Sequence, residues 1–321
     1  MYNNFNNTGM YNQVYQPPTN NNSFNKEYVE SETKNLKQVI EGRKDSKATY
    51  AYERCISEMY KSDGFGLYKF GYIEDIDEIT IDTITEYYNW LINNAKIDIF
   101  ISGKINNEDV KSILLNNENI KKLNPREGYY ILNNESTECK EIVEKENEIF
   151  ESMNVVQGKL VLGLDVDFKE ENAQCIALVY NAILGDGANS MMFQNVREKE
   201  GLAYSSKSSF IKQKMNIFVR CGIQIENYEK ALSLIKVQLE NIKNGLFTDE
   251  DIEVAKVYLT SSIKNIEEEQ DTEVVYYIGQ ELSKTNRSVE EYISRIEKVS
   301  KEDVLNIAKN VHVNTVYFLK N

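Results

Sequence analysis

The most informative segment of this 321-residue chain reads GDGANSMMFQNVREKEGLAYSS and covers residues 185–206. Gly185 and Gly187 mark a turn at the end of an apolar helical pattern. The spacing of a second helix follows, carried by Met191, Met192, Phe193 and Val196. Gly201 ends that helix, so Arg197 stands near its end and Tyr204 opens the next strand. The segment thus predicts a turn, a helix and a strand in quick succession.

The sequence around this segment predicts a domain with several strands. In GKLVLGLDVDF, residues 158–168, apolar side chains alternate with period two, which is typical of a strand. LAYSSKSSF and MNIFVRCGIQI form a predicted antiparallel pair, and NTVYFL forms a last strand. The predicted order is β-β-α-α-β-β-α-α-α-α-β. This order indicates an α+β fold with an antiparallel or mixed sheet and helices packed on one face.

The part of the chain before this domain is mostly helical by pattern. Helices are predicted around Leu36 to Ile40, over residues 46–60 and over residues 79–95, and KIDIFISG at residues 96–103 predicts a buried strand. Three helices and one strand predict the rear part of a larger α+β domain. The predicted organisation is a disordered Asn-rich tail at 1–23, a first domain at 24–105, a linker at 106–137 and a second domain at 138–321.

The composition excludes several classes of partner. The formal charge is −14, whereas a nucleic-acid or anionic-membrane binder needs a basic surface. A basic partner or substrate stays open. The four cysteines form no Cys-x-x-Cys motif, which favours a reducing compartment. Because no apolar run reaches membrane-spanning length and the N-terminus lacks a signal-peptide pattern, we expect a cytoplasmic protein.

The residues of the chain alone give little support for catalysis. His312 is the only histidine, so a zinc site or a Ser-His or Cys-His pair lacks the residues it needs. GDGANS lacks the Gly-Lys-Ser/Thr of a phosphate loop and joins two predicted helices. Acidic pairs such as Glu290 with Glu291 are typical of solvated helix faces in so acidic a chain. The sequence therefore predicts no catalytic residue, no metal site and no cofactor in this chain.

The stretch LGDGANSMMFQNVREKEGLAYSSKSSF resembles the signature of the C-terminal domain of the M16 (pitrilysin/insulinase) metallopeptidases. The shared features are the Gly-containing turn, the S-x-x-F helix and V-R-E-K-x-G-L-A-Y. Residues 24–71 are similar to the rear of the N-terminal domain of that family, so the resemblance covers most of residues 24–321. It implies two M16-type (LuxS/MPP-like) domains, the first of them incomplete.

The resemblance also implies a role for Arg197 and Tyr204. In this family the second half of the molecule contributes an Arg and a Tyr that bind the substrate backbone opposite the metal, and these two residues match them. A guanidinium and a phenol can both donate hydrogen bonds to a peptide carbonyl, and such bonds strengthen as negative charge develops on its oxygen.

The sequence departs from the active members of the family in two places. Active members bind zinc through an H-x-x-E-H stretch and through a distant glutamate that lies seven residues after another acidic residue. The H-x-x-E-H stretch is absent from this chain. If Glu32 matches the first acidic residue, the position of the glutamate ligand falls on Val39. The resemblance therefore implies a non-catalytic, N-terminally shortened subunit of the bacterial heterodimeric type. Its partner would carry H-x-x-E-H and zinc and would hydrolyse or process peptides. A peptide-binding or scaffold protein without hydrolysis, and a degenerate remnant, stay open.

Overall fold

The structure is a computed structural model that describes residues 19–20, 23–121 and 146–321. These residues form two compact units. The first unit contains the described residues up to 45 together with 68–99 and 104–121, and the second contains 46–67, 100–103 and 146–321. These units cut the chain differently from the predicted domains at 24–105 and 138–321, whose boundaries stay a prediction.

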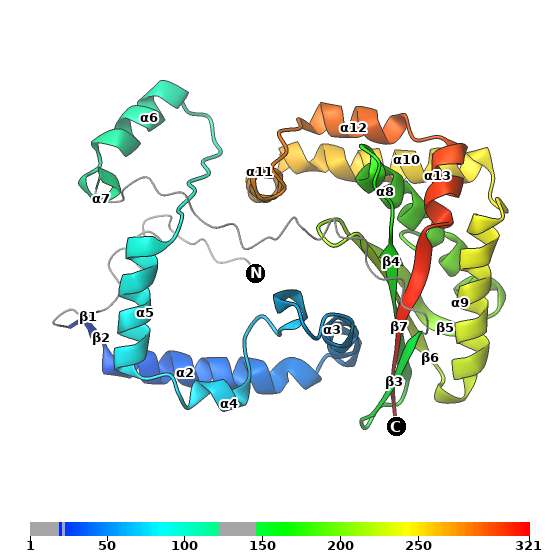
Figure 1. Cartoon of the computed structure of the whole chain (residues 1–321), viewed down its shortest axis with the longest axis horizontal. Helices are drawn as coiled ribbons and strands as arrows, with labels where there is room; N and C mark the ends of the chain where they lie inside the picture. Colours follow the sequence, from blue (N-terminus) through cyan, green and yellow to red (C-terminus); the bar gives the residue numbers. More distant parts are fainter. Residues whose placement is uncertain (1–18, 21–22, 122–145) are drawn as a thin grey trace. The chain divides into compact units, whose positions relative to one another are not determined.

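A five-stranded sheet lies at the centre of the second unit (Figure 1), in the order β3-β7-β4-β6-β5. The β3 and β7 strands are parallel, and the other neighbours are antiparallel. The mixed sheet expected from the sequence is therefore confirmed, as is the pairing of β5 with β6. The strands are β3 (Asn147–Ser152), β4 (Gly158–Val166), β5 (Ala203–Ile211), β6 (Asn216–Ile223) and β7 (Val311–Lys320).

One face of this sheet carries the main helical layer. Alternate residues of the strands, such as Leu160, Leu162 and Val219, form one buried cluster with side chains of these helices. The layer contains α8 (Ala173–Leu184), the π-helix η3 (Met192–Lys199), the 3₁₀-helix η4 (Ile225–Asn227), α9 (Tyr228–Lys243), α10 (Asp249–Lys264), the 3₁₀-helix η5 (Asn265–Glu268), α11 (Gln270–Leu282), α12 (Val289–Glu297) and α13 (Lys301–Ala308).

The stretch between β6 and β7, which the structure describes throughout, contains five α-helices where the sequence analysis expects four. The predicted helix start at Thr248 is confirmed, because its hydroxyl and Asp251 form a reciprocal capping box. The extra boundaries come from serine caps: Ser288 accepts a hydrogen bond from the Glu291 amide, and Ser300 accepts one from the Asp303 amide.

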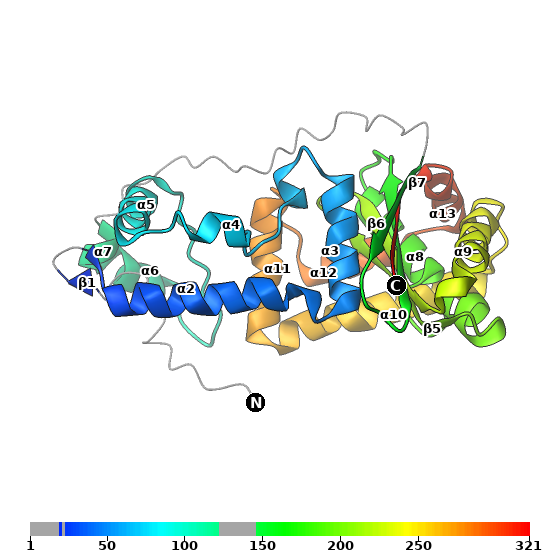
Figure 2. The ribbon, with the colours of Figure 1, turned by 90° about the horizontal axis from the view of Figure 1, so that it is seen from below.

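The other face of the sheet is covered by α3 (Lys47–Met59), which is followed by the short 3₁₀-helix η2 (Gly64–Gly66). A second buried cluster joins Tyr50, Ala51 and Cys55 of α3 to strand side chains that point away from the main layer. Figure 2 shows α3 beside the sheet. Helices thus cover both faces of the central strands, which explains why every residue of β4 except Lys159 is buried.

The carboxylate of Glu151 on β3 ties α3 to the sheet. It accepts hydrogen bonds from the Tyr50 hydroxyl (2.6 Å), from the Arg54 Nε (3.1 Å) and from the Tyr317 hydroxyl on β7 (2.7 Å). Burial raises the pKa of Glu151, but the hydrogen bonds from Tyr50, Tyr317 and Arg54 outweigh burial and leave the pKa below its usual value. The charged form is therefore the one that holds α3 in place.

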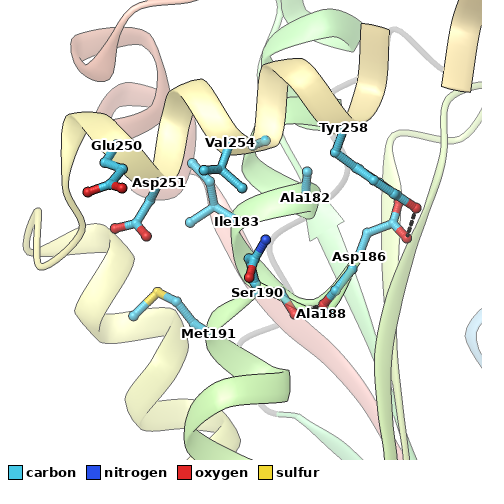
Figure 3. Close-up of a pocket in the computed structure, with 13 residues that line it drawn as sticks. Ala182, Ile183, Asp186, Ala188, Ser190, Met191, Glu250, Asp251, Val254 and Tyr258 are labelled. Atoms are coloured by element: carbon cyan, nitrogen blue, oxygen red, sulfur yellow. Dashed lines mark hydrogen bonds between the residues drawn. The ribbon is translucent and has the colours of Figure 1, made fainter. Parts of the chain in front are cut away.

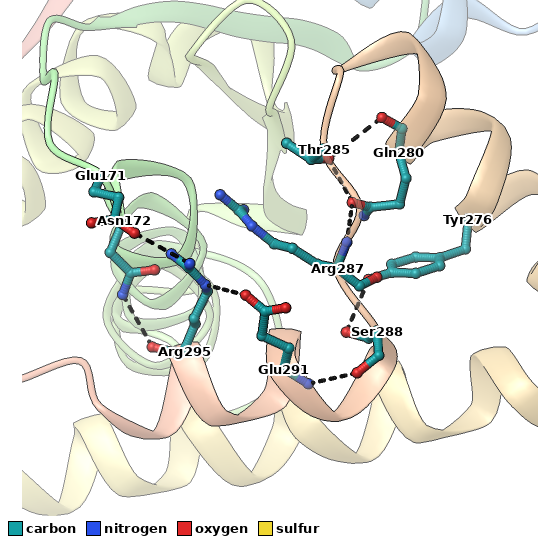
Figure 4. A network of polar contacts seen from close by, with 9 residues as sticks. All are labelled: Glu171, Asn172, Tyr276, Gln280, Thr285, Arg287, Ser288, Glu291 and Arg295. Atoms are coloured by element: carbon teal, nitrogen blue, oxygen red, sulfur yellow. Dashed lines mark hydrogen bonds and ion pairs between the residues drawn. The ribbon is translucent and has the colours of Figure 1, made fainter.

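A polar network around the N-terminus of α8 holds α12 in the main layer (Figure 4). The guanidinium of Arg295 lies 3.2 Å from carboxylate oxygens of both Glu171 and Glu291. The side-chain amide of Asn172 donates to the backbone carbonyl of Arg295 (3.1 Å). The Tyr276 hydroxyl donates to the backbone carbonyl of Arg287 (3.0 Å). These contacts join the N-terminus of α8 and the middle of α11 to α12 and the loop before it.

Gly185 brings the end of α8 against strand β5. Its carbonyl accepts a hydrogen bond from the Ser208 amide (2.8 Å), and the Ser208 hydroxyl donates to the Asn181 carbonyl (3.2 Å). A Cβ at position 185 would lie only 2.7 Å from the Ser208 hydroxyl oxygen and 2.9 Å from its backbone nitrogen. Glycine at this position is therefore required by a close approach of two backbones.

The first unit consists mainly of helices. Ile76 is its only buried hydrophobic residue among those described. Lys37 pairs with Asp77 at 3.0 Å, and Phe24 packs edge-on against Tyr88. The elements are β1 (Thr19–Asn20), β2 (Ser23–Phe24), α2 (Lys26–Glu41), the 3₁₀-helix η1 (Gly42–Lys44), α4 (Ile73–Ile76), α5 (Ile81–Asn94), α6 (Asn107–Asn116) and α7 (Glu118–Lys121). Most of the predicted tail and the second half of the predicted linker lie outside the described residues.

The strand predicted at residues 96–103 is wrong, because this segment contains no strand. Ile97, Ile99 and Ile101 are 39%, 41% and 45% exposed. Their alternation is that of a strand, but a strand needs a neighbour that accepts its backbone hydrogen bonds. No described strand pairs with this segment, so its pattern has no sheet to join.

We expect Glu151→Gln to lower the free energy of unfolding by about 1–2 kcal/mol at pH 7, because it removes the charge that strengthens three hydrogen bonds. The folded pKa is lowered, so this stabilisation is present above the unfolded pKa of about 4.3 and is lost as the pH falls through the folded value. Urea unfolding curves of parent and variant should therefore differ at pH 7 and converge as the pH falls below about 4.3. Glu148→Gln on the exposed side of β3 is the matched control, and an equal loss there would contradict a specific role for Glu151.

We expect Gly185→Ala to destabilise the protein by about 1–3 kcal/mol, because the added methyl group overlaps β5. Gly64→Ala is the matched control, since a Cβ at position 64 meets nothing within 4 Å. The measurement is the midpoint of thermal unfolding for each variant. Equal midpoints for the parent and Gly185→Ala would show that the turn can move away from β5 without loss of stability.

Candidate functional site

The π-helix η3 presents the candidate site and is anchored along one side. Met192 and Val196 are fully buried in the main cluster. The Asn195 side-chain amide donates to the side-chain carbonyl of Gln238 on α9 (2.7 Å), and Gln238 is itself buried. The helix predicted here is therefore confirmed, and its π winding is a feature that is frequent at functional sites.

Arg197 directly follows buried Val196 and points to solvent, with 43% of its side chain exposed. Its guanidinium lies 4.7 Å from the ring centre of Phe193, one turn earlier in η3, so the two groups form a cation–π contact. The Arg197 Nε lies 3.5 Å from a carboxylate oxygen of Glu198. These contacts orient the guanidinium and leave its outer nitrogens available to a ligand.

The chain then turns at Gly201, whose φ of +61° lies in the left-handed region that favours glycine. Leu202 and Ala203 are buried after the turn, whereas Tyr204 is 55% exposed. The pairing of β5 with β6 shifts between Ala203 and Ser205, so Tyr204 lies at a β-bulge. A bulge changes the direction in which a strand presents its side chain. The sequence analysis places Tyr204 in this strand, and the structure confirms that placement.

Gln224 fixes the phenol of Tyr204. Its side-chain amide donates a hydrogen bond to the Tyr204 hydroxyl oxygen. The phenol accepts this bond, so its own hydrogen can be donated to another group. The sequence analysis missed Gln224, because nothing in the pattern GIQI distinguishes it from any other polar residue at the end of a strand.

The site therefore presents two hydrogen-bond donors on adjoining elements, since η3 packs against β5. A guanidinium and a phenol can bind a peptide carbonyl or a carboxylate. Among the described cysteines, none offers an exposed thiol nucleophile. Burial raises the pKa of the thiols of Cys175 and Cys221 to about 11, so both are protonated at neutral pH.

The described side chains do not form a site that fits zinc. Among them, no group of three or more His, Cys, Asp or Glu residues could hold a metal ion. His312 lies on β7 beside Asp165 of β4, and it has no second imidazole in the chain with which to share a metal.

A cavity of about 250 Å³ lies behind the turn that precedes η3 (Figure 3). Asp186 of the turn and Tyr258 of α10 line it and are joined by a hydrogen bond of 3.2 Å. Burial raises the pKa of the Asp186 carboxyl, against the opposing effects of Tyr258, Lys207 and Arg220. Sequence reasoning missed this pair, because its members are 72 residues apart.

Comparison with known proteins finds a family match that includes the candidate site. Residues 78–259 match the family model described as the peptidase M16 inactive domain. A Bacillus subtilis protein named probable inactive metalloprotease YmfF is 30% identical over 311 residues, which make up 96% of this chain and 71% of that protein.

Solved structures show the same fold. A conserved protein from Enterococcus faecalis is similar with a TM-score of 0.85 and 25% identity, over 98% of this chain and 73% of the other. A peptidase M16 inactive domain from Pseudomonas fluorescens is similar with a TM-score of 0.69 and 17% identity, over 92% and 71% of the two chains. The fold, the matched segment and the sequence relative agree, and the chain belongs to the M16 peptidase family, with residues 78–259 matching the inactive domain of that family.

Proposed function

We propose that this chain is the zinc-free subunit of a heterodimeric M16 peptidase and that Arg197 and Tyr204 bind the backbone of the peptide substrate. The partner subunit supplies H-x-x-E-H and the zinc ion. The observation that carries the proposal is the pair of exposed donors on two adjoining, well-anchored elements of a chain that matches the inactive domain of the family.

The supports of each donor favour binding over a purely structural role. Phe193 holds the guanidinium of Arg197 through its ring face, and Gln224 leaves the hydrogen of the Tyr204 hydroxyl free to be donated. Donors that are fixed before the ligand arrives lose less freedom on binding. They also stabilise a developing negative charge without reorganising.

Two other functions are compatible with the same fold. A peptide-binding or scaffold protein would use Arg197 and Tyr204 without any hydrolysis, and a remnant would use neither. The complementation experiment below separates these functions from the subunit role.

We also propose a cytoplasmic location. The described cysteines Cys55, Cys175 and Cys221 are free thiols in buried positions, which suits a reducing compartment. Among the residues that the structure describes, every helix is too short or too polar to span a bilayer.

The proposal is tested by mixing the chain with an M16 chain from the same organism that carries H-x-x-E-H. Complex formation is measured first by size-exclusion chromatography with light scattering, and cleavage of a quenched fluorescent peptide is measured next. We expect Arg197→Ala to lower kcat/KM by about 100-fold or more and Tyr204→Phe by about 10-fold, because each removes a donor to the developing oxyanion.

Lys199→Ala is the matched control, since Lys199 is an exposed cation on the same helix. An active complex in which both site variants cleave like the parent would remove the substrate-binding role. Peptide binding by the lone chain that Arg197→Ala weakens, without any complex, would support the scaffold function instead.

We further expect Gln224→Ala to lower kcat/KM by about 3- to 10-fold, because the phenol of Tyr204 loses its fixed orientation. In a Tyr204→Phe background the same substitution should have almost no effect, since its partner is already gone. Independent, additive losses in this double-mutant cycle would show that Gln224 does not act through Tyr204.

A further inference from the structure

The cavity behind the turn before η3 has a composition that suits one class of ligand. Its aliphatic wall includes Ala182 and Ile183 of α8 and Val254 and Ala255 of α10. Figure 3 shows Ala182, Ile183 and Val254 between the Asp186–Tyr258 pair at one end and the carboxylates of Glu250 and Asp251 at the other. None of the described residues that line the cavity is a lysine or an arginine.

The carboxylate of Asp186 is the partly buried polar end of this cavity. Its one hydrogen bond among the described residues comes from the Tyr258 hydroxyl, at 3.2 Å. A carboxylate accepts up to about four hydrogen bonds, so most of its capacity is unused. Burial disfavours the charged form, and Lys207 and Arg220 compensate only from outside the cavity wall. A cation inside the cavity would supply the missing charge and donors.

The other end is different, because one of its acids caps a helix and the other is exposed. Asp251 caps α10 through the Thr248 amide and hydroxyl, and Glu250 is exposed in the first turn of that helix. These two residues give that end of the cavity a negative potential, whereas Asp186 is available to bind. The aliphatic wall between the ends is suited to an alkyl stem, as in a lysine side chain.

We propose that this cavity binds an alkylammonium group, with the charged nitrogen at Asp186 and Tyr258 and the alkyl stem against Ala182, Ile183 and Val254. The group can belong to a lysine side chain of a peptide or to a free aliphatic amine. This binding site lies in the lone chain and does not depend on a partner subunit, on zinc, or on Arg197 and Tyr204.

The test uses the whole chain and three probes, with binding followed by ligand-detected NMR. The probes are Nα-acetyl-lysine methylamide, its neutral counterpart Nα-acetyl-norleucine methylamide, and n-butylammonium. We expect the lysine probe to bind at least about 10-fold more tightly than the norleucine probe, because only the former pairs with Asp186. Binding of both cationic probes supports a side chain as the ligand, and binding of butylammonium alone supports a free amine.

Two variants locate the site. Asp186→Asn should weaken binding of the cationic probes by about 10-fold or more, and Ala255→Leu should abolish it by filling the cavity. Glu253→Gln removes one charge from the exposed side of α10, outside the cavity lining, and should leave binding unchanged. Circular dichroism confirms that each variant is folded. The proposal is overturned if no cationic probe binds, if the norleucine probe binds as tightly as the cationic probes that bind, or if both cavity variants bind like the parent.

Discussion

Burial of the central strand β4 on both faces is the constraint on which the second unit depends. Leu160 and Leu162 face the main helical layer, and Val161 faces α3. Because β4 also pairs with β6 and β7, its backbone groups are satisfied inside the sheet. Loss of either helical cover would expose a continuous apolar strip. The hydrogen bonds that Glu151 accepts from α3 and β7 keep the smaller cover in place.

The candidate site lies where this burial ends. The β5 strand is at the edge of the sheet, and each exposed donor directly follows a buried residue, one in η3 and one at the start of β5. Val196 is buried and Arg197 is exposed, and Ala203 is buried and Tyr204 is exposed. Each donor is thus attached to the residue that fixes it. A chain that has no described metal-binding group can in this way keep a precise surface for a ligand.

Much of this arrangement could be predicted from local patterns. The period-two strands, the capping box at Thr248 and the turn, helix and strand over residues 185–206 are all encoded in short stretches. Features that depend on distant contacts could not be predicted. The packing of α3 against the outer face of the sheet joins Cys55 to Val161, and the Asp186–Tyr258 pair joins α10 to a turn.

The strand predicted at 96–103 is wrong because its pattern is local, whereas a strand also needs a partner strand elsewhere in the chain. The π winding of η3 could not be predicted from the sequence either. The apolar spacing of Met192 and Val196 suits an ordinary α-helix as well.

That winding affects how readily this surface can change during evolution. A π-helix accommodates extra residues in each turn, so the loss of one residue lets it relax into an α-helix. Met192 and Arg197 are separated by the five-residue spacing that a π-helix brings to one side. Deletion of one residue between them would leave the four-residue spacing of an α-helix, which keeps both side chains on nearly the same side. The direction of the Arg197 side chain can therefore survive the loss of one codon within η3, while the sheet beneath it stays intact.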